Sequence, residues 1–449
     1  MAEVVMPAQG FIPRSYQLGF WKFMQHGGRK AVLCYPRRHG KDILSLNWMA
    51  CASIQRVGLY VYVFPLQNQA RRVVWNGIDG QGKKFIDAWP RELIASKSNA
   101  EMRLHLKNGS VVQILGSDDP DKLVGMNPVG LVYSEYAMAN PMSWKLVSPI
   151  LAENGGWVVF NSTPRGMNHF SKMLNHAKAN AWDRKTYPPK ANQWFWQHET
   201  AKTLKVLTPE DLRVMRGELG DEALFQQEAF CSFSSPMQGA YYDNQLKFLR
   251  KNGRIGKVPA DPRLPVHTGW DLGIDDATAI WFAQVHGREV RLVHYYENSG
   301  EGLPHYARYL KDWAADNNLS YGFHYAPHDI SVRELTSGKS RLESAKSMGL
   351  RFRPVKKHAV EDGIEQTRNF LPQCWIDAEG CERGVDCLAS YRKEWDPLHA
   401  VFKTRPLHDW ACHAADALRT LAWGMKVKDH RDKKSQPQAY SDEEYSVFG

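Results

Sequence analysis

The sequence predicts an α/β protein with two domains, each of the size of a catalytic domain, and three observations support this class. In the first half, short apolar runs alternate with helical patterns, which is typical of a mostly parallel sheet. Apolar runs return in the second half, beyond a stretch rich in Pro and Gly, and they indicate a second α/β domain. The length of 449 residues, at about 150 residues per domain, also favours more than one core.

The composition disfavours several protein classes. Lys and Arg (58) exceed Asp and Glu (48), and the net charge of +10 favours a polyanionic partner. We expect no membrane span, because no apolar run approaches the ~18 residues required, and no secretory signal, because the start lacks its basic and apolar regions. Seven scattered cysteines predict reduced thiols rather than a disulfide framework, and the spacing of Cys374, Cys381 and Cys387 disfavours structural zinc.

The elements of the first domain follow from its apolar runs. Five predicted strands cover 30–35, 58–64, 111–115, 129–134 and 156–161. From 166 to about 230 the pattern is helical and contains no strong strand. Residues 232–264 carry Ser-Ser-Pro, Gly and repeated Pro, so this segment is the predicted linker.

The second domain begins with a predicted antiparallel meander. Its strands are expected at 266–271, 279–285 and 290–296, with a further strand at 321–326. A helix over 408–424 ends the folded part, and the polar tail 426–449 is expected to be flexible.

A predicted phosphate-binding loop follows the first strand and opens a helix. Residues 35–42 read Tyr-Pro-Arg-Arg-His-Gly-Lys-Asp, and Gly40 with Lys41 matches the end of the G-x-x-x-x-G-K-[ST] pattern. In this context the backbone N–H groups and the helix N-terminus bind phosphates, while Lys41 reaches the β and γ oxygens. Tyr35 replaces the first Gly of the pattern, and Asp42 replaces the Ser or Thr. A basic turn is the alternative interpretation.

Two further strand ends carry polar residues. The segment Gly130–Glu135 is an apolar strand that ends in an acid, as Walker B strands do, although Ser134 stands where the usual Asp would be. Glu135 is the predicted general base that orients the attacking water; a strand-end carboxylate in solvent is the alternative. The segment Asn161–Gly166 follows another strand and could sense a γ-phosphate, or it could be a Pro-Gly turn.

The two departures from the phosphate-loop pattern form a pair. In an ordinary site a Walker A hydroxyl ligates Mg²⁺, and a Walker B Asp holds the ion from the facing strand. Here the carboxylate is at position 42 and the hydroxyl at position 134. We therefore predict that Asp42 binds the ion directly or through water while Ser134 takes the lesser role. The alternative is that Asp42 caps the following helix.

Carboxylates in the second half lie at strand ends and on the last helix. Asp271 ends one predicted strand, and Asp329 follows another. In the last helix, Asp409, His413 and Asp416 have i, i+4, i+7 spacing and are predicted to share one face. Three such carboxylates can hold two divalent ions about 4 Å apart, which activate water and stabilise the leaving oxygen in phosphodiester cleavage. For any single Asp, a cap or turn role is the alternative.

A basic run lies between Asp329 and the last helix. Residues 331–358 hold eight Lys or Arg and two Glu, a net charge of +6. We interpret the run as a surface that binds the phosphates along a DNA backbone without sequence preference. A solvated loop and helix face is the alternative.

Read together, these segments resemble the large terminase subunit of tailed bacteriophages, the motor that packages DNA into procapsids. Residues 36–42 are similar to the arginine-rich Walker A of that family, Glu135 matches its catalytic Glu, and 162–166 match its coupling motif. Residues 14–17 are similar to the adenine-recognising Gln motif, and 64–70 resemble the strand-to-helix motif after Walker A. The second half resembles the RNase H-like nuclease domain of the family, in which two strands and the C-terminal helix supply the acids.

The resemblance implies a domain plan and a set of site residues. The domains are a P-loop ATPase core at 1–165, a helical lid at 166–231, a linker at 232–264, an RNase H-like nuclease at 265–425 and a tail at 426–449. The implied nucleotide-binding residues are Gln17, Arg37, Arg38, His39, Gly40, Lys41, Asp42 and Thr163. The implied catalytic residues are Lys41, Glu135, Asp271, Asp329 and Asp416. The implied metal ligands are Asp42, Asp271, Asp329 and Asp416, with Asp409, Asp276 and His413 in support, and the choice between Asp409 and Asp416 as the direct ligand stays open.

The resemblance also implies a function, cofactors and partners. We expect ATP hydrolysis to drive double-stranded DNA into the procapsid, and a metal-dependent endonuclease to cut concatemers. The implied cofactors are ATP and Mg²⁺, with Mn²⁺ possible at the nuclease site. The implied partners are DNA, the portal protein, a small terminase subunit and further copies in a pentamer, with no membrane. The implied location is the host cytoplasm and transiently the portal, not the mature virion.

Two other functions fit the same residues. One is a nuclease or transposase-type enzyme whose first domain binds nucleotide only as a switch. The other is a DNA-binding scaffold in which both sites are degenerate. The arginine finger stays open among Arg37, Arg38, Arg71, Arg72 and Arg103.

Overall fold

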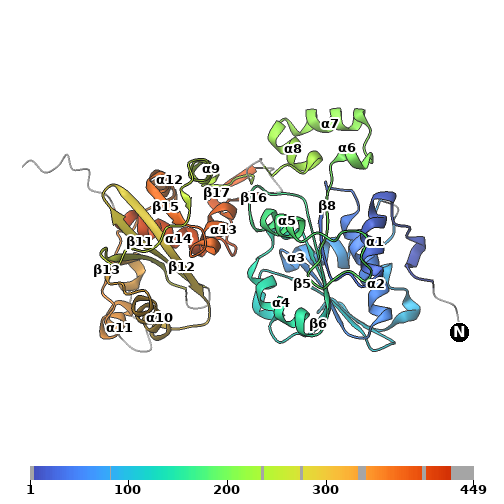
Figure 1. The fold of residues 1–449 in the computed structure, drawn as a ribbon, viewed down its shortest axis with the longest axis horizontal. Helices are drawn as coiled ribbons and strands as arrows, with labels where there is room; N and C mark the ends of the chain where they lie inside the picture. The colour runs from blue at the N-terminus through green and yellow to red at the C-terminus, as the bar shows by residue number, and fades with distance from the viewer. Residues whose placement is uncertain are drawn as a thin grey trace, which may run out of the picture. The chain divides into compact units, whose positions relative to one another are not determined.

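The computed structural model describes residues 5–80, 82–233, 237–273, 277–331, 340–396 and 401–425. The chain divides into two compact units. The first comprises Met1–Gly253 with Cys381–Ala415, and the second comprises Arg254–Gly380 with Asp416–Gly449. Each unit contains its own large sheet with helices packed beside it (Figure 1). The predicted α/β class is therefore confirmed in both halves of the chain.

The first unit is built on an eight-stranded sheet in the order β3-β4-β5-β2-β6-β7-β1-β8. All neighbours from β5 to β8 are parallel, and β3 and β4 add an antiparallel edge. The strands are β1 (Lys30–Cys34), β2 (Leu59–Phe64), β3 (Ile94–Ser98), β4 (Arg103–Leu106), β5 (Val111–Gly116), β6 (Pro128–Ser134), β7 (Trp157–Ser162) and β8 (Phe195–His198). The five predicted strands are confirmed as β1, β2, β5, β6 and β7.

The expectation that 166–230 contains no strong strand is wrong, because β8 lies within it. This strand has only four residues, Phe-Trp-Gln-His, and half of them are polar, so it gives no apolar run. β8 pairs in parallel with β1 over Ala31 to Cys34, and it is the edge strand of the sheet on that side.

The first unit also contains α-helices. They are α1 (Leu18–Gln25), α2 (Lys41–Gln55), α3 (Gln67–Ala70), α4 (Met142–Glu153), α5 (His169–Ala179), α6 (Ala201–Leu204), α7 (Pro209–Leu219), α8 (Glu222–Phe230), α9 (Asp243–Lys251) and α13 (Glu382–Ser390). The predicted linker includes α9, and residues 381–415 group with the first unit, including the hairpin of β16 (Lys393–Asp396) and β17 (Val401–Pro406).

Two layers of buried apolar side chains pack on the two faces of the first sheet. Along β2, the aromatic residues Tyr60, Tyr62 and Phe64 pack into one layer, while Val61 and Val63 pack into the other. This alternation is expected, because successive side chains of a strand point to opposite faces. Parallel sheets are covered on both faces, so their strands form nearly continuous apolar runs. The polar residues at the strand ends are therefore the ones available for chemistry.

The second unit has a seven-stranded sheet in the order β14-β13-β10-β11-β12-β15-β9. Its first three long strands form an antiparallel meander, as predicted, and β13 and β14 continue in parallel beside β10. The strands are β9 (Ile255–Gly256), β10 (Val266–Asp271), β11 (Thr278–His286), β12 (Glu289–Asn298), β13 (Tyr321–Ala326), β14 (Phe352–Pro354) and β15 (Cys374–Asp377). The helices are α10 (Leu303–Asp316), α11 (Arg341–Ser347), α12 (Val360–Phe370) and the end of α14 (Cys412–Gly424).

In the part of the chain that the structure describes, no helix has the length and apolar character of a membrane span.

Candidate active site

The phosphate-type loop joins the buried strand β1 to the N-terminus of α2. Gly40 is the N-cap residue of α2 and has a φ of 77°, a left-handed conformation that favours glycine. A Cβ atom at this position would lie 3.2 Å from the side-chain nitrogen of Gln17. The loop thus needs glycine where it turns into the helix, which leaves the helix N-terminus accessible to an anion.

Lys41 lies at the centre of the site. Its ammonium is 2.9 Å from Oε1 of Glu135, which follows β6, and it donates to Oγ1 of Thr163, which follows β7, at 3.3 Å. The lysine side chain is only 5% exposed. Burial by itself would lower its pKa, but the charges of Glu135 and Asp42 outweigh burial and raise the pKa of Lys41. The structure therefore brings three predicted residues from three segments together around one charged ammonium.

Glu135 has the features of a positioned carboxylate. Its backbone is left-handed, with a φ of 51°, which is uncommon outside glycine and is found at functional sites. Burial would raise its pKa, but Lys41 and then Arg165 outweigh burial and keep the pKa of Glu135 below its usual value. Its second oxygen, Oε2, is buried and has no hydrogen-bond partner among the described residues. An ionised carboxylate with an unused acceptor can hold and orient a water molecule.

Asp42 and Ser134, the two departures from the pattern, are in direct contact. The Ser134 hydroxyl donates to Oδ1 of Asp42 at 2.6 Å. The hydroxyl of Tyr62, on β2, donates to the same oxygen at 2.8 Å. Because the N-cap residue of α2 is Gly40 and no side chain caps this end, Asp42 is not the cap of the helix. Tyr62 was not expected from the sequence, where it is one aromatic residue in an apolar run.

The residues of the predicted Gln motif contact the backbone of the phosphate loop. Gln17 donates to the carbonyl of Gly40 at 3.2 Å and accepts from the backbone N–H of Arg14 at 2.9 Å. The hydroxyl of Tyr16 donates to the carbonyl of His39 at 2.8 Å. Gln17 is 1% exposed, so in this structure it supports the loop. Its predicted contact with a base stays a prediction.

The other loop residues differ in their surroundings. His39 is buried, and its Nδ1 lies 2.7 Å from the carbonyl of Arg37, while its Nε2 has no hydrogen-bond partner in the part of the chain that the structure describes. Burial lowers the pKa of His39, so the ring is neutral at pH 7. Arg38 is exposed and has a left-handed φ of 61°.

A buried carboxylate connects α8 to the loop before α2 and to the segment after β7. Glu228 accepts from Arg165 at 2.6 Å, and its other oxygen lies 2.9 Å from Arg37 in the phosphate loop. Sequence reasoning missed Glu228, because nothing in the sequence of α8 marks the position that packs against the two arginines.

A cavity of about 370 Å³ lies beside the Gln-motif residues. It is lined by Ser15, Tyr16, Gly19, Trp182, Arg184, Phe195, Gln197, Glu199, Thr203 and Leu204. Tyr16 belongs both to this wall and to the support of the phosphate loop. The cavity combines aromatic walls with amide, hydroxyl and charged groups, as binding sites for small ligands do.

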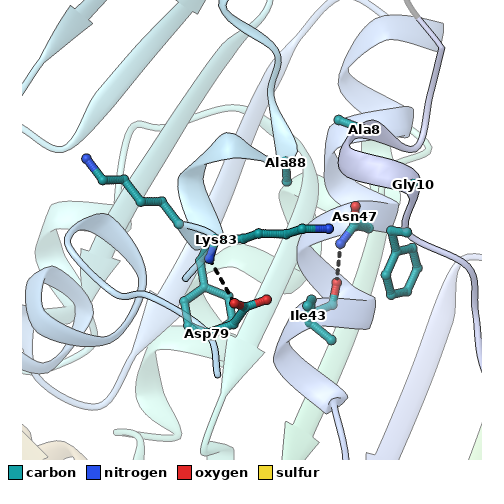
Figure 2. A pocket seen from close by; sticks show the side chains of 10 residues that line it. Ala8, Gly10, Ile43, Asn47, Asp79, Lys83 and Ala88 are labelled. Atoms are coloured by element: carbon teal, nitrogen blue, oxygen red, sulfur yellow. Dashed lines mark hydrogen bonds between the residues drawn. The ribbon is translucent and has the colours of Figure 1, made fainter. Parts of the chain in front are cut away.

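A second cavity, of about 140 Å³, lies at α2 (Figure 2). Figure 2 shows Ile43 and Asn47 of α2 on one side and Asp79 and Lys83 on the other. Asn47 donates to the carbonyl of Ile43 at 2.8 Å, and the backbone N–H of Lys83 donates to Asp79 at 2.9 Å. None of its ten lining residues is a predicted site residue.

In the second unit, two predicted acids follow neighbouring parallel strands. Asp271 is the last residue of β10, and Asp329 lies in the short helix His328–Ser331 just beyond β13. Gly269 of β10 pairs with Tyr325 of β13, so both strands end at the same edge of the sheet. This is the edge at which polar residues of parallel strands usually meet a ligand.

Asp416 lies where α14 packs on β10. A Cβ atom at Gly269 would lie 2.3 Å from Leu421 and 2.8 Å from the carbonyl of Ala417, so helix and strand are in close contact. Asp416 itself forms an ion pair with Arg419 at 2.9 Å. Among the described residues, no three His, Cys, Asp or Glu side chains are close enough to hold a metal ion. Asp276 lies outside the described residues, and the predicted metal ligands stay predictions.

The expectation that Asp409 shares a helix face with His413 and Asp416 is wrong. The helix begins at Cys412, and Asp409 lies before it. The Asp409 carboxylate accepts from the backbone N–H of Ala411 at 3.0 Å and pairs with Arg392 at 3.2 Å. A short acidic residue just before a helix commonly accepts such backbone bonds, and this competes with helical structure.

The described part of the basic run carries exposed charge. Its exposed basic residues are Lys346, Arg351, Arg353, Lys356 and Lys357. The guanidinium of Arg353 lies 3.2 Å from the ring centroid of Phe323, which holds it over the middle of β13. Arg333 and Lys339 lie outside the described residues.

Comparison with solved structures finds similarity to phage large terminases. The chain is 15% identical to the large terminase of a thermophilic bacteriophage in complex with ADP, over 91% of this chain and 98% of that one, with a TM-score of 0.40. It is 17% identical to the large terminase ATPase domain of Thermus phage P74-26 (51% and 100% covered, TM-score 0.40). It is 13% identical to the magnesium-bound large terminase nuclease of thermophilic phage G20c (42% and 99% covered, TM-score 0.31). No protein-family model and no curated protein matches the chain.

Proposed function

We propose that this chain is the large subunit of a phage DNA-packaging motor, which hydrolyses ATP to move double-stranded DNA and cuts that DNA with a metal-dependent nuclease. The observation that carries the proposal is the contact of Lys41 with both Glu135 and Thr163. A phosphate-binding lysine, a buried acid and a strand-end hydroxyl are the groups that phosphoryl transfer to water requires. All three were predicted from the sequence.

The residues present fit MgATP. The N-terminus of α2 and Lys41 supply positive charge for the phosphates, and Asp42 supplies a carboxylate oxygen of the kind Mg²⁺ prefers. In this proposal the base enters the cavity beside Tyr16, which would connect recognition of the base to the backbone of the phosphate loop. Bound Mg²⁺ would neutralise charge on the β and γ phosphates.

In the proposed reaction, Glu135 accepts a hydrogen bond from the attacking water through Oε2, the oxygen that lacks a partner here. Lys41 keeps Glu135 ionised and would itself turn to the phosphate oxygens when nucleotide binds. Arg165 and Glu228 connect the segment after β7 to α8 of the lid. This buried pair is the proposed route by which a change at the nucleotide moves the lid.

The proposed nuclease site is the edge of the second sheet where β10 and β13 end. Asp271, Asp329 and Asp416 are the proposed metal ligands. In the described residues, no three His, Cys, Asp or Glu side chains are close enough to hold a metal ion. The exposed basic residues around Arg353 would hold the DNA backbone near this edge.

The proposed partners and location follow from the same function. They are double-stranded DNA, a portal protein, a small terminase subunit and further copies of this chain, in the host cytoplasm and transiently at the portal. Processive translocation would require a ring of copies of this chain. One of the arginines of this chain would serve as the arginine finger.

The direct test is steady-state ATP hydrolysis by the full chain with and without double-stranded DNA, together with Mg²⁺- or Mn²⁺-dependent plasmid cleavage. The proposal expects DNA to stimulate ATP turnover and the plasmid to be cut only with a divalent ion. Very slow ATP turnover with active cleavage would instead support a nucleotide switch. DNA binding without either activity would support a scaffold.

A further inference from the structure

Tyr62 is a buried tyrosine in the middle of the first sheet whose hydroxyl contacts a carboxylate. It lies on β2, is fully buried, and donates to Oδ1 of Asp42 at 2.8 Å. The phenol O–H is therefore the donor, and the carboxylate oxygen of Asp42 is the acceptor.

Ser134 reinforces the same contact. It is fully buried at the end of β6 and donates to the same oxygen, Oδ1, at 2.6 Å. Two hydroxyls from two neighbouring strands thus hold one oxygen of Asp42, while Oδ2 receives neither bond. Hydrogen bonds to an ionised acceptor are short and strong, so this pair of donors fixes the orientation of the carboxylate.

The neighbouring charge explains why such positioning is required. Lys41 immediately precedes Asp42 in the chain and brings a positively charged ammonium to the first turn of α2. Without a competing contact, Asp42 would be drawn toward this ammonium and would compete with Glu135 for it. The two hydroxyls bond to Oδ1 of Asp42, and Lys41 pairs with Glu135 at 2.9 Å.

We propose that Tyr62 is a positioning residue for the nucleotide-bound divalent cation, because it orients Asp42 so that the second carboxylate oxygen serves as the metal ligand. The inference rests on the proposed nucleotide site and assigns a role to a residue that the phosphate-loop pattern does not contain. Groups that hydrogen-bond to a metal ligand orient it and tune its basicity, and their loss typically weakens metal binding 10- to 100-fold.

A purely structural role for the Tyr62 hydroxyl is the competing explanation, since buried hydroxyls need a partner of some kind. Tyr60 provides the comparison. It lies two residues earlier on the same face of β2, in the same buried layer, but its hydroxyl donates to the backbone carbonyls of Ala52 and Arg56 at 2.8 and 2.6 Å. Loss of that hydroxyl removes similar bonds at a distance from Asp42, so Tyr60→Phe is the matched control.

The test is binding of a fluorescent ADP analogue to the full chain, titrated with Mg²⁺ from a starting point in EDTA. We expect the unmodified chain, Tyr62→Phe and Tyr60→Phe to bind the analogue within twofold of one another in EDTA. We expect Tyr62→Phe to raise the Mg²⁺ concentration at the midpoint about tenfold or more. Tyr60→Phe should leave the midpoint within twofold of the unmodified chain, and electron paramagnetic resonance with Mn²⁺ should show the same order of affinities.

An unshifted midpoint in folded Tyr62→Phe overturns the inference, and so does an equal shift in Tyr62→Phe and Tyr60→Phe. If Tyr62→Phe does not fold, Ser134→Ala decides: a raised midpoint supports positioning by the two hydroxyls, and an unchanged one overturns it. If the unmodified chain binds no nucleotide with or without Mg²⁺, the proposed function fails and the inference fails with it. Nucleotide binding that depends on Mg²⁺ but not on Tyr62 refutes the inference alone.

Discussion

The two candidate sites differ in how far their charged groups come together. In the first unit, Lys41 contacts Glu135 at 2.9 Å and Thr163 at 3.3 Å. In the second, Asp271 and Asp329 lie at one sheet edge, but the described residues hold no ready group of three ligands. The difference has an electrostatic cause: an ammonium and a carboxylate attract one another without a ligand, whereas several carboxylates repel until a cation lies between them.

The largest expected effect comes from substitutions that inactivate one site only. Lys41→Ala removes the charge at the phosphate loop and should reduce ATP turnover to background, while plasmid cleavage stays within about twofold. Asp271→Ala should abolish plasmid cleavage and leave DNA-stimulated ATP turnover near that of the unmodified chain. Parallel assays of both activities on both folded variants check this. Equal loss of both activities in either variant would contradict the assignment of two separate sites.

Relative to the usual phosphate-loop pattern, the carboxylate stands at position 42 and the hydroxyl at position 134. Substitutions at these two positions should therefore have coupled effects on ATP turnover. Asp42→Ser removes the only carboxylate that this pair contributes, and Ser134→Asp places two carboxylates around one ion, so each should strongly reduce ATP turnover. Because the two side chains are 2.6 Å apart, the double variant should recover activity beyond the additive expectation. A double-mutant cycle measures this coupling. Strictly additive losses would show that the groups do not share one ion.

Substitutions of Asp409 and of Asp416 should differ in their effects on folding stability and on plasmid cleavage. Asp409→Ala loses the bond to Ala411 and the pair with Arg392, which we expect to cost about 1 kcal/mol of unfolding free energy and little cleavage activity. Asp416→Ala should abolish cleavage with a smaller effect on stability. Denaturant unfolding and plasmid cleavage on both variants provide the measurements. Full loss of cleavage in a stably folded Asp409→Ala would restore Asp409 as a metal ligand.

The smallest expected effect concerns the exposed basic residues. Neutralising Arg351, Arg353, Lys356 and Lys357 should weaken binding to all DNA sequences alike and make the dependence of log K on log salt shallower, by up to ~0.9 per lost phosphate contact. Binding titrations at several salt concentrations on two unrelated duplexes check this. An unchanged slope would assign these residues to an ordinary solvated surface.

The sequence allowed us to predict the site residues that follow a recognisable strand along the chain. It did not allow us to predict the residues whose contacts arise only when separate elements pack together. Lys41 and Glu135 could be found because each follows a recognisable apolar strand, and strand ends meet at one sheet edge. Tyr62 and Glu228 could not, since their contacts arise from side chains of separate elements packed together. Asp409 was misplaced on a helix because its spacing fitted a helical period, whereas the helix starts three residues later, at Cys412.

The most direct test of the central claim, that Glu135 is the base of an ATP-hydrolysing site, uses Glu135→Gln. The amide keeps the size of the side chain but cannot accept a proton, so ATP turnover should fall by about 10²–10⁴. Binding of ATP in the presence of Mg²⁺ should be retained, and plasmid cleavage should be unaffected. A folded Glu135→Gln variant that hydrolyses ATP at the rate of the unmodified chain would contradict the account.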